Sequence, residues 1–396
     1  MNVAVVAEFY PRARDPVLGI WAHRQALAAR AAGAEVRVLV LHRPIPPAAA
    51  LAARDRRAIG AGLRQPSRAR IDGLEVRYVP FLSPPRGRTY GQWGAWAAPP
   101  LAAALRALRR SFPFDVVHAH YAVPAGEAVR LARIGTPCVI SEHGGDVFYT
   151  APRSAAGRAA VERAFGHARL VLANSAGIAA RCRELGADAT RVVHLGTDVP
   201  AEPAAAPASP LLVTVAHLVA RKRHADVIRA LWLLRDRHPE LRYEIVGDGP
   251  ERAALAGLAA ELGVSGRVAF RGQLPPDAAV AAGRAATAFV MPSIDEAFGV
   301  AYVEAMAAGV PAVAALGEDG PAEIAAAGGG IELVPPGDVE ALAARIDALV
   351  ADPDWRARLG EQARATVTSA FTWERCGRAT VEAYASALEP PGTRAR

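Results

Sequence analysis

The segment VAVVAEFYPRARDPVLGIWAHRQALAARAAGAEVRVLVL, residues 3–41, indicates the fold class. Its first five residues form a short apolar run, and the loop that follows contains two prolines and Gly19. Residues 20–32 have helical character and end at Gly33, and residues 36–41 are apolar again. Strand, loop, helix and strand in this order predict the βαβ unit of a parallel sheet.

The same alternation continues on both sides of a proline-rich segment. Residues 199–210, VPAEPAAAPASP, have no core-forming pattern and predict an extended linker. We therefore predict two doubly wound α/β units whose parallel strands end at a shared interdomain cleft. The further predicted strands are residues 74–79, 116–118, 138–141, 170–173, 192–194, 211–216, 243–246, 268–270, 288–291 and 311–314, and the predicted helices after the linker are residues 226–237, 252–262 and 300–308.

Composition and charge limit the classes of partner. The 396 residues include 46 basic side chains, of which Lys222 is the only lysine, and the net charge is +7. No dense basic run contains interleaved aromatic residues, so we expect no nucleic-acid partner. Only three cysteines occur, which supports neither a zinc ribbon nor a disulfide framework. The start of the chain does not resemble a signal peptide, and no apolar stretch is long enough to span a membrane, so we expect a cytoplasmic protein.

The segment EAFGVAYVE, residues 296–304, is the strongest chemical signal. Gly299 would let a ligand approach the backbone, and the amides that begin the helix at Val300 would face an anion. Glu296 precedes the helix and Glu304 lies in its second turn, so we assign one to sugar hydroxyls and the other to ribose hydroxyls. Either glutamate alone is equally typical of an ordinary helix start.

The same segment resembles the E-x(7)-E motif of the retaining family-four glycosyltransferases, which have the GT-B fold. Six other segments match the family in order across nearly the whole chain. They are His118-Ala-His120, Ser141-Glu-His-Gly-Gly-Asp146, Leu195-Gly-Thr-Asp198, residues 214–223, residues 245–251 and residues 268–272. Phe371-Thr-Trp-Glu374 resembles the family's helix that crosses back onto the first domain.

The resemblance implies a domain assignment. Residues 1–198, completed by the C-terminal helix at 371–389, would form a Rossmann-like acceptor-binding domain. Residues 211–370 would form the Rossmann-like domain that binds the nucleotide-sugar donor, and residues 199–210 would link the two.

The implied catalytic residues are Glu296, Lys222 and His143. Lys222 follows a strand and a short loop, where a compact positive charge suits a leaving diphosphate. His143 follows the strand that ends at Ser141 and would lie beside the anomeric centre, where Asp146 could support it. The implied donor-binding residues are Gly19, His217, Arg221, Lys222, Arg271, Glu296, Ala297, Phe298, Gly299, Val300 and Glu304.

Two positions depart from the family pattern. His217 replaces the usual arginine, and a histidine is a weaker, pH-dependent partner for phosphate. Arg223 replaces the glycine after the motif lysine. Either Arg221 or Arg223 could take over the role of the missing arginine.

We expect no metal and no cofactor. His118 and His120 would share one face of a strand, but no third ligand has suitable spacing. Asp352-Pro-Asp354 has the D-x-D form that another glycosyltransferase fold uses for metal, yet it lies at a helix start, where we interpret Asp354 as the N-cap. Gly247-Asp-Gly249 does not complete a dinucleotide fingerprint, because position 252 is arginine.

These observations predict transfer of a hexosyl group from a nucleotide diphosphate sugar to a hydroxyl acceptor in bacterial polysaccharide or glycoconjugate synthesis. A UDP-sugar is the first choice of donor and GDP-mannose the second. The alternatives are a non-hydrolysing sugar-nucleotide epimerase and a non-catalytic two-domain binding protein. Basic residues in segments 54–70 and 101–110 could contact an anionic membrane surface at its inner face, although a solvated basic face explains them slightly better.

Overall fold

The computed structural model describes residues 1–396 except 13–14, 46–52, 57–59, 61–64, 206 and 390–396. The chain divides into two compact units. The first contains Met1–His194 and the residues from Trp373 onward, and the second contains Leu195–Thr372. Among the described residues, no helix has both the length and the apolar character needed to cross a membrane.

The first unit is built on an eight-stranded sheet of order β3-β4-β2-β1-β5-β6-β7-β8. Neighbouring strands are parallel except for β3, which pairs antiparallel with β4. The strands are β1 Asn2–Ala7, β2 Glu35–His42, β3 Arg68–Ile71, β4 Leu74–Pro80, β5 Val116–His120, β6 Cys138–Glu142, β7 Leu170–Ala173 and β8 Thr190–Val192.

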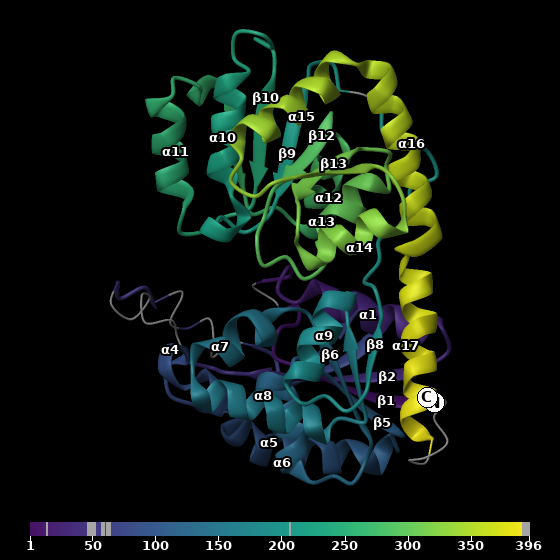
Figure 1. The fold of residues 1–396 in the computed structure, drawn as a ribbon. Helices are drawn as coiled ribbons and strands as arrows, with labels where there is room; N and C mark the ends of the chain where they lie inside the picture. The colour runs from purple at the N-terminus through teal and green to yellow at the C-terminus, as the bar shows by residue number, and fades with distance from the viewer. Residues whose placement is uncertain (13–14, 46–52, 57–59, 61–64, 206, 390–396) are drawn as a thin grey trace. The chain divides into compact units, whose positions relative to one another are not determined.

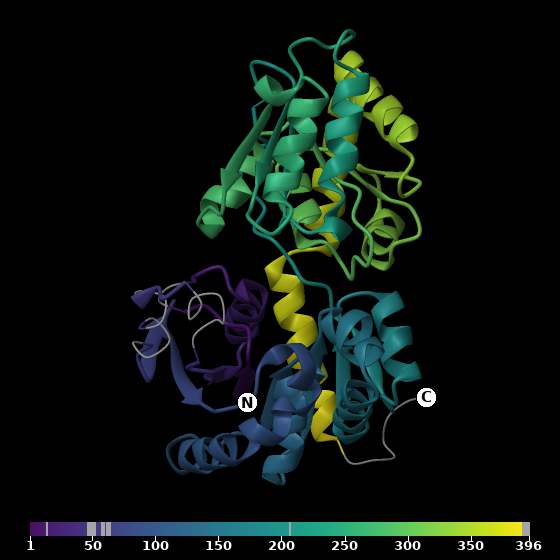
Figure 2. The same cartoon turned by 90° about the vertical axis from the view of Figure 1, so that its left-hand side faces the viewer.

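Helices cover both faces of this sheet, as the reversal of strand order at β1 requires. Helix α17 lies beside α1, whereas α5, α6 and α8 pack against one another in a separate layer (Figures 1 and 2). The helices are α1 Ile20–Ala31, α4 Arg86–Thr89, α5 Trp93–Ser111, α6 Glu127–Ala132, α7 Ala151–Arg153, α8 Ala155–His167, α9 Ala176–Glu184 and α17 Trp373–Leu388.

The second unit has a six-stranded, fully parallel sheet of order β11-β10-β9-β12-β13-β14. Its strands are β9 Leu211–Val215, β10 Arg242–Val246, β11 Val268–Gly272, β12 Ala288–Met291, β13 Ala312–Ala315 and β14 Ile331–Val334. Its helices are α10 His224–Leu233, α11 Arg252–Glu261, α12 Pro276–Arg284, α13 Val300–Met306, α14 Asp319–Ala327, α15 Val339–Ala351 and α16 Pro353–Ala370.

The core of the second unit explains why its strands are almost continuously apolar. A parallel sheet is covered on both faces, so its central strands bury nearly every side chain, and β12 and β13 bury all of theirs. Helices α10 and α15 pack together over one face through residues such as Ile228, Leu231 and Ile346, all of which are fully buried. Helices α12 and α13 pack against each other as a separate pair.

Two local predictions need correction. The N-cap of α16 is Asp352, whose carboxylate accepts a hydrogen bond from the N–H of Trp355 at 2.8 Å, and Asp354 lies in the first turn. Pro353 takes the first helical position, where its missing N–H costs nothing, and this moves the cap one residue before it. The strand predicted at residues 192–194 lies at Thr190–Val192 instead.

The basic segment 54–70 is described only in part. Arg57 and Arg64, two of its arginines, lie outside the described residues. Arg68 and Arg70 belong to β3, where Arg68 is opposite Arg77 and Arg70 is opposite Glu75. At least these two arginines are therefore placed by sheet pairing.

Candidate functional site

In the second unit, most of the predicted donor residues lie in the segments that follow β9 and β12, two strands that pair in the sheet. The residues Ala220–Lys222 form one turn of 3-10 helix after β9. The backbone N–H of Ile294, in the loop after β12, donates to the carbonyl of Arg221 at 2.9 Å. Because parallel strands end at the same edge of a sheet, both loops lie at its carboxyl edge, where open α/β sheets bind ligands.

Lys222 and Glu296 form an ion pair at this edge. Both are buried, with 9% and 8% of their surface exposed, and the Lys222 ammonium donates to Glu296 Oε2. Ser293 Oγ donates to the same oxygen at 2.8 Å, and the Arg221 guanidinium lies 4.0 Å from it. Burial alone would raise the pKa of Glu296, but Lys222 lowers it below its usual value. Burial also lowers the pKa of Lys222, against the pull of Glu296.

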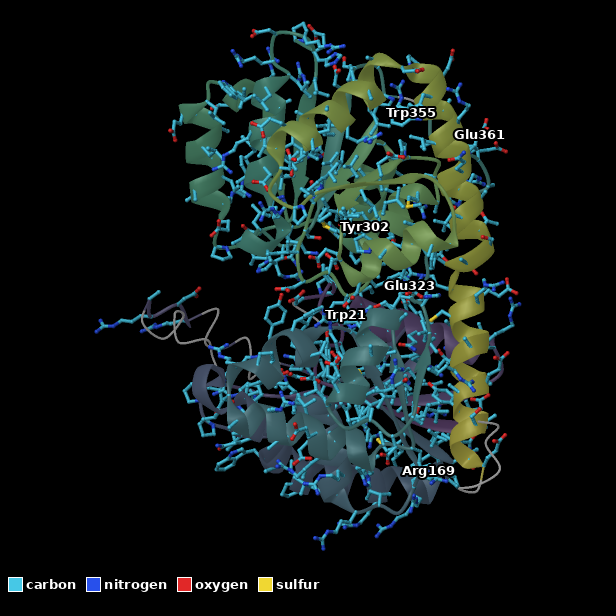
Figure 3. All side chains as sticks on the ribbon, in the orientation of Figure 1. Trp21, Arg169, Tyr302, Glu323, Trp355 and Glu361 are labelled. Carbon is cyan, nitrogen blue, oxygen red and sulfur yellow. The ribbon has the colours of Figure 1, made fainter. Side chains whose placement is uncertain are left out.

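Gly299 has a structural reason to be glycine. It precedes α13 with a φ of 90°, in the left-handed region, and a Cβ there would lie 2.2 Å from the ring of Tyr302. The Tyr302 hydroxyl, on the side chain labelled in Figure 3, donates to the carbonyl of Met291 and lies 3.2 Å from Ser293 Oγ. Gly299 therefore allows Tyr302 to brace the loop that carries Glu296. Val300 is the first residue of α13.

The residues before Gly299 fix the same loop by packing. Ala297 and Phe298 are both buried. The Phe298 ring meets the Phe371 ring edge-on, with centroids 5.5 Å apart. The N–H of Glu296 donates to Glu318 Oε2 at 2.9 Å, so its backbone is held independently of its side chain.

The other predicted donor residues are less closely grouped. His217 is exposed in the loop after β9. Arg271 lies on the edge strand β11 and pairs with Glu244 at 3.0 Å. Glu304 is partly buried in α13, and its carbonyl accepts from Arg284 Nε at 3.1 Å. Lys222 and Arg221 thus lie together with Glu296, whereas Arg271 lies against Glu244 on the edge of the sheet.

The structure separates the two arginines that could replace the family's missing one. Arg223 adopts a left-handed conformation with a φ of 55°, which is the conformation that the glycine of the family pattern would favour at this position. Its guanidinium donates to Asp226 Oδ2 at 2.6 Å. Arg221 instead lies beside Glu296, so Arg221 is the better candidate for a phosphate partner.

In the first unit, Gly19 lies directly before α1 with a φ of 65°. A Cβ at this position would fall 2.2 Å from the carbonyl carbon of Phe9. The loop from β1 therefore closes on itself just before α1, and only glycine fits that approach.

His143 follows β6 and contacts a second histidine. Its Nε2 and His120 Nδ1 are 3.0 Å apart and share a hydrogen bond, and the two rings are stacked. The rings of Trp21 and Tyr121 meet His143 edge-on at 6.2 and 5.3 Å; Trp21 is labelled in Figure 3. Burial, with a further contribution from His118, lowers the pKa of His143 to about 3. The imidazole is therefore neutral near neutral pH.

Asp146 was expected to support His143, but the structure places its carboxylate against the backbone that follows β5. One carboxylate oxygen accepts from the backbone N–H groups of Ala122 and Val123 at 2.6 and 3.1 Å. Burial raises the pKa of Asp146 to about 6. Its role in the structure is to hold the loop that follows β5.

The H-x-H pair has the predicted geometry, with ring centroids 4.5 Å apart. His118 uses both ring nitrogens in hydrogen bonds, one with the Tyr384 hydroxyl and one with Ser141 Oγ, each at 2.8 Å. It therefore ties α17 to the sheet. Within the part of the chain that the structure describes, no group of three or more His, Cys, Asp or Glu side chains could hold a metal ion.

Sequence reasoning missed the residues that brace the site. Ser293 and Tyr302 were not singled out, although Ser293 follows the end of β12 and Tyr302 lies three residues after Gly299. It also missed Glu8, Arg86 and Tyr90. Tyr90 donates to Glu8 Oε2 at 2.7 Å across 82 residues of sequence, and no local pattern signals such a contact.

Comparison with known proteins adds an independent line of evidence. Residues 198–366 match the family model described as "Glycosyl transferases group 1", and residues 18–201 match "Glycosyltransferase Family 4". The chain is 33% identical to a D-inositol 3-phosphate glycosyltransferase of Streptomyces scabiei, over 76% of this chain and 72% of the relative.

Two further proteins extend the comparison. A GDP-mannose-dependent alpha-(1-6)-phosphatidylinositol monomannoside mannosyltransferase of Mycolicibacterium smegmatis is 35% identical over 42% of this chain and 46% of its own. The structure of Anabaena Alr3699/HepE in complex with UDP and glucose superposes with a TM-score of 0.70, at 20% identity, over 98% of this chain and 100% of that one. The two parallel-sheet units and this likeness confirm the predicted GT-B fold. The matched family models and the Streptomyces relative show that the protein is an enzyme and that the chain belongs to the group 1 glycosyltransferases of family 4.

Proposed function

We propose that this enzyme transfers a hexosyl group, with retention of configuration and without a metal, from a nucleotide diphosphate sugar to a hydroxyl acceptor in glycan or glycoconjugate synthesis. The observation that carries the proposal is the buried contact of Lys222 with Glu296, with Arg221 beside it. Two cations and a carboxylate at the carboxyl edge of a parallel sheet suit a donor that has both a diphosphate and sugar hydroxyls.

The chemistry assigned to these groups is electrostatic. The bond between the anomeric carbon and the diphosphate breaks, and negative charge grows on the departing phosphate. Lys222 and Arg221 would stabilise that charge because they are already in place, with Lys222 buried and Arg221 one third exposed. Glu296 would bind sugar hydroxyls, and Glu304 the ribose.

Retention is proposed to proceed by substitution on one face of the sugar. The acceptor hydroxyl bonds to the anomeric carbon as the diphosphate leaves, and the departing phosphate takes the acceptor's proton. The neutral ring of His143 would lie beside the reacting centre. Family membership favours this transfer reaction over the epimerase and non-catalytic alternatives.

A UDP-sugar is the first choice of donor and GDP-mannose the second. Support for the first comes from the HepE structure, which was determined with UDP and glucose. Support for the second comes from the mycobacterial relative, whose name states that it depends on GDP-mannose. The acceptor could be presented at an anionic membrane surface, a proposal that rests on exposed arginines such as Arg106, Arg109 and Arg110 of α5.

Slow hydrolysis of the donor in the absence of an acceptor tests the proposal. The enzyme is incubated with UDP-glucose or GDP-mannose in the presence of EDTA, and the released sugar is followed by proton NMR. We expect one nucleotide diphosphate to be released, with the sugar first appearing as the α-anomer and with no effect of EDTA. A first product of β-configuration, or complete inhibition by EDTA, would contradict the proposal.

A further inference from the structure

A cavity of about 410 Å³ lies on the face of the first unit's sheet that packs against α5. This volume is within the range of roughly 300–1,000 Å³ that is usual for small-molecule pockets. The walls of the cavity come from β2, β3 and β4 and from the C-terminal part of α5, where Ala107, Leu108 and Ser111 line it. The site described above uses none of these segments, so the proposed reaction gives this cavity no role.

The cavity lies towards the opposite edge of the sheet from the predicted reacting centre. Arg37, near the start of β2, and Glu75, near the start of β4, both line it. His143 directly follows the carboxyl end of β6. Since β2, β4 and β6 run in the same direction, their amino ends share one edge of the sheet and their carboxyl ends the other. A ligand in the cavity is therefore distinct from an acceptor beside His143.

Strand pairing gathers the charged residues of the cavity on one face of the sheet. Arg37 is paired with Glu75, and Arg77 is paired with Arg68. Paired residues point to the same side of a sheet, and so does every second residue of one strand, so all four side chains share this face. Three arginines and one glutamate give the cavity a net charge of +2.

Arg68 and Arg77 form a like-charged pair. They are directly opposite each other on β3 and β4, and both are exposed. Glu75, the acidic residue of the cavity, pairs with Arg37 at 3.1 Å, and within the described part of the chain neither Arg68 nor Arg77 forms an ion pair. Like charges in this position destabilise a sheet, and an anion bound between them would replace repulsion with attraction. Charged residues also protect an edge strand from aggregation, but that role does not require two arginines to be opposed.

Arg37 is already oriented for binding. Its guanidinium carbon lies 5.0 Å from the centre of the Phe112 ring, and its Nε lies 3.1 Å from a Glu75 carboxylate oxygen. About a third of its side chain, 32%, remains exposed. A guanidinium that is held on two sides loses little freedom when it binds a ligand, and its planar edge suits the oxygens of a phosphate.

We propose that this cavity binds a phosphate monoester, which Arg68 and Arg77 hold between them with Arg37 beside it. A phosphate monoester carries a charge of about −1.5 to −2 at neutral pH, which matches the net charge of the cavity. A carboxylate or a phosphodiester carries only a single negative charge and matches it less well. The ligand is a phosphorylated molecule other than the sugar donor and its acceptor, and its phosphate belongs either to a soluble compound or to a lipid headgroup. The inference does not depend on the proposed function.

Calorimetric titration of the full chain with glycerol 3-phosphate and with dimethyl phosphate tests the proposal. Glycerol 3-phosphate is a monoester and represents both sources of the ligand, whereas dimethyl phosphate is a diester. We expect the monoester to bind tenfold or more tightly than the diester. Arg68→Gln and Arg77→Gln should each weaken the monoester tenfold or more. Arg158→Gln is the matched control, since Arg158 is exposed on α8 and pairs with Glu162, and it should have no effect.

Further variants show whether the loss of affinity arises in the cavity itself. Arg77→Lys keeps the charge without the planar fork and should keep part of the affinity. Arg68→Gln removes one of two opposed like charges, so it should leave the melting temperature unchanged or raise it. Lys222→Ala changes the predicted donor site in the second unit and should leave the affinity unchanged.

Five results would overturn the proposal. They are no binding of glycerol 3-phosphate, equal binding of the diester, equal effects of Arg68→Gln and Arg158→Gln, a marked fall in the melting temperature of Arg68→Gln, and loss of binding in Lys222→Ala. The fourth would show that the arginines stabilise the sheet instead of binding a ligand. The fifth would show that the phosphate binds at the predicted donor site.

Vesicle binding separates the two sources of the phosphate. The full chain is sedimented with phosphatidylcholine vesicles that contain phosphatidic acid, whose headgroup is a phosphate monoester. Vesicle binding that Arg68→Gln abolishes would assign the cavity to a lipid headgroup. Binding of glycerol 3-phosphate without vesicle binding, or with vesicle binding that Arg68→Gln does not change, would assign it to a soluble phosphorylated compound. Either result supports a phosphate site in this cavity.

Discussion

Lys222 and Glu296 are 74 residues apart in sequence and form a buried ion pair, with the Lys222 ammonium donating to the Glu296 carboxylate. Ser293 and Arg221 approach the same carboxylate from other positions. Lys222 was predicted to bind the diphosphate and Glu296 the sugar. In the structure the two groups bind each other. A donor that contacts both must therefore either join this ion pair or separate its two members.

The ion pair should behave as a coupled unit in stability measurements. Lys222→Met should lower the free energy of unfolding by about 3 kcal/mol, because it leaves a buried carboxylate without its partner. Adding Glu296→Gln should recover most of that loss, because the neutral amide needs no counter-charge. Urea unfolding of the two single variants and the double variant measures the coupling. Additive losses would show that the pair contributes no interaction energy.

Gly299 should tolerate no side chain. Gly299→Ala combines a left-handed backbone with a Cβ that would overlap the Tyr302 ring, and we expect a loss of about 2–4 kcal/mol in unfolding free energy. Gly257→Ala is the matched control, because this helical glycine has open space around it. It should stabilise by about 0.5–1 kcal/mol. Equal effects of the two substitutions would contradict this account of Gly299.

His120 is expected to position His143. The two rings stack and share a hydrogen bond of 3.0 Å, so His120→Ala should let the His143 ring move. Since small displacements at a reacting centre are costly, kcat should fall roughly tenfold to a hundredfold while donor affinity stays unchanged. His120→Asn, which can still form a hydrogen bond, should restore part of kcat. An unchanged kcat, or a loss confined to donor affinity, would argue against this positioning role.

Because His118 is buried, it should make a pH-dependent contribution to the free energy of unfolding. Its pKa is lowered by burial to about 3, from 6.5 when exposed. Below pH 6.5 the unfolded chain therefore binds a proton that the folded chain does not, and stability falls as the pH falls. The stability difference between the natural protein and His118→Gln should shrink by about 1 kcal/mol per pH unit between pH 6 and pH 4.

The quantity to measure is the difference in the free energy of unfolding between the natural protein and His118→Gln. Asp146, whose pKa is raised to about 6, acts in the opposite direction in the same range, but it is present in both. Urea unfolding at pH 7, 6, 5 and 4 gives the comparison. A difference that does not change with pH would mean that His118 is not held in its neutral form.

Much of the fold could be predicted because parallel strands are nearly continuous apolar runs. Residues 170–173 and 288–291 were predicted with the bounds that the structure has. The edge strand β3 was missed, because its arginines alternate with smaller apolar residues and it gains its order by pairing with β4. β14 was missed because four residues between a glycine run and a proline pair give little periodicity.

The candidate site was predictable where its functional residues lie close together in the sequence. The motif that contains Glu296 and Gly299 can be recognised directly. The contact of Glu296 with Lys222 joins two loops at the same edge of the sheet. It was predictable only because both segments match the pattern of one family.

The contact of Tyr90 with Glu8 could not be predicted, because it joins segments that are 82 residues apart. The contacts of Tyr302 with Met291 and Ser293 are closer in sequence, but a single hydroxyl contact leaves no periodic pattern.

The measurement that tests the central claim most directly is thermal stabilisation by UDP, GDP, ADP and NAD, for the natural protein and for Lys222→Ala. A nucleotide at about 100 times its Kd should add roughly 2.7 kcal/mol to stability. Arg237→Ala is the control, since Arg237 is an exposed cation of the same unit that pairs with Asp347. We predict that UDP or GDP alone raises the melting temperature, that Lys222→Ala abolishes the shift and that Arg237→Ala keeps it. Stabilisation by NAD alone, by none of the four, or equally in the presence and absence of Lys222 would contradict the assignment of this site to a nucleotide-sugar donor.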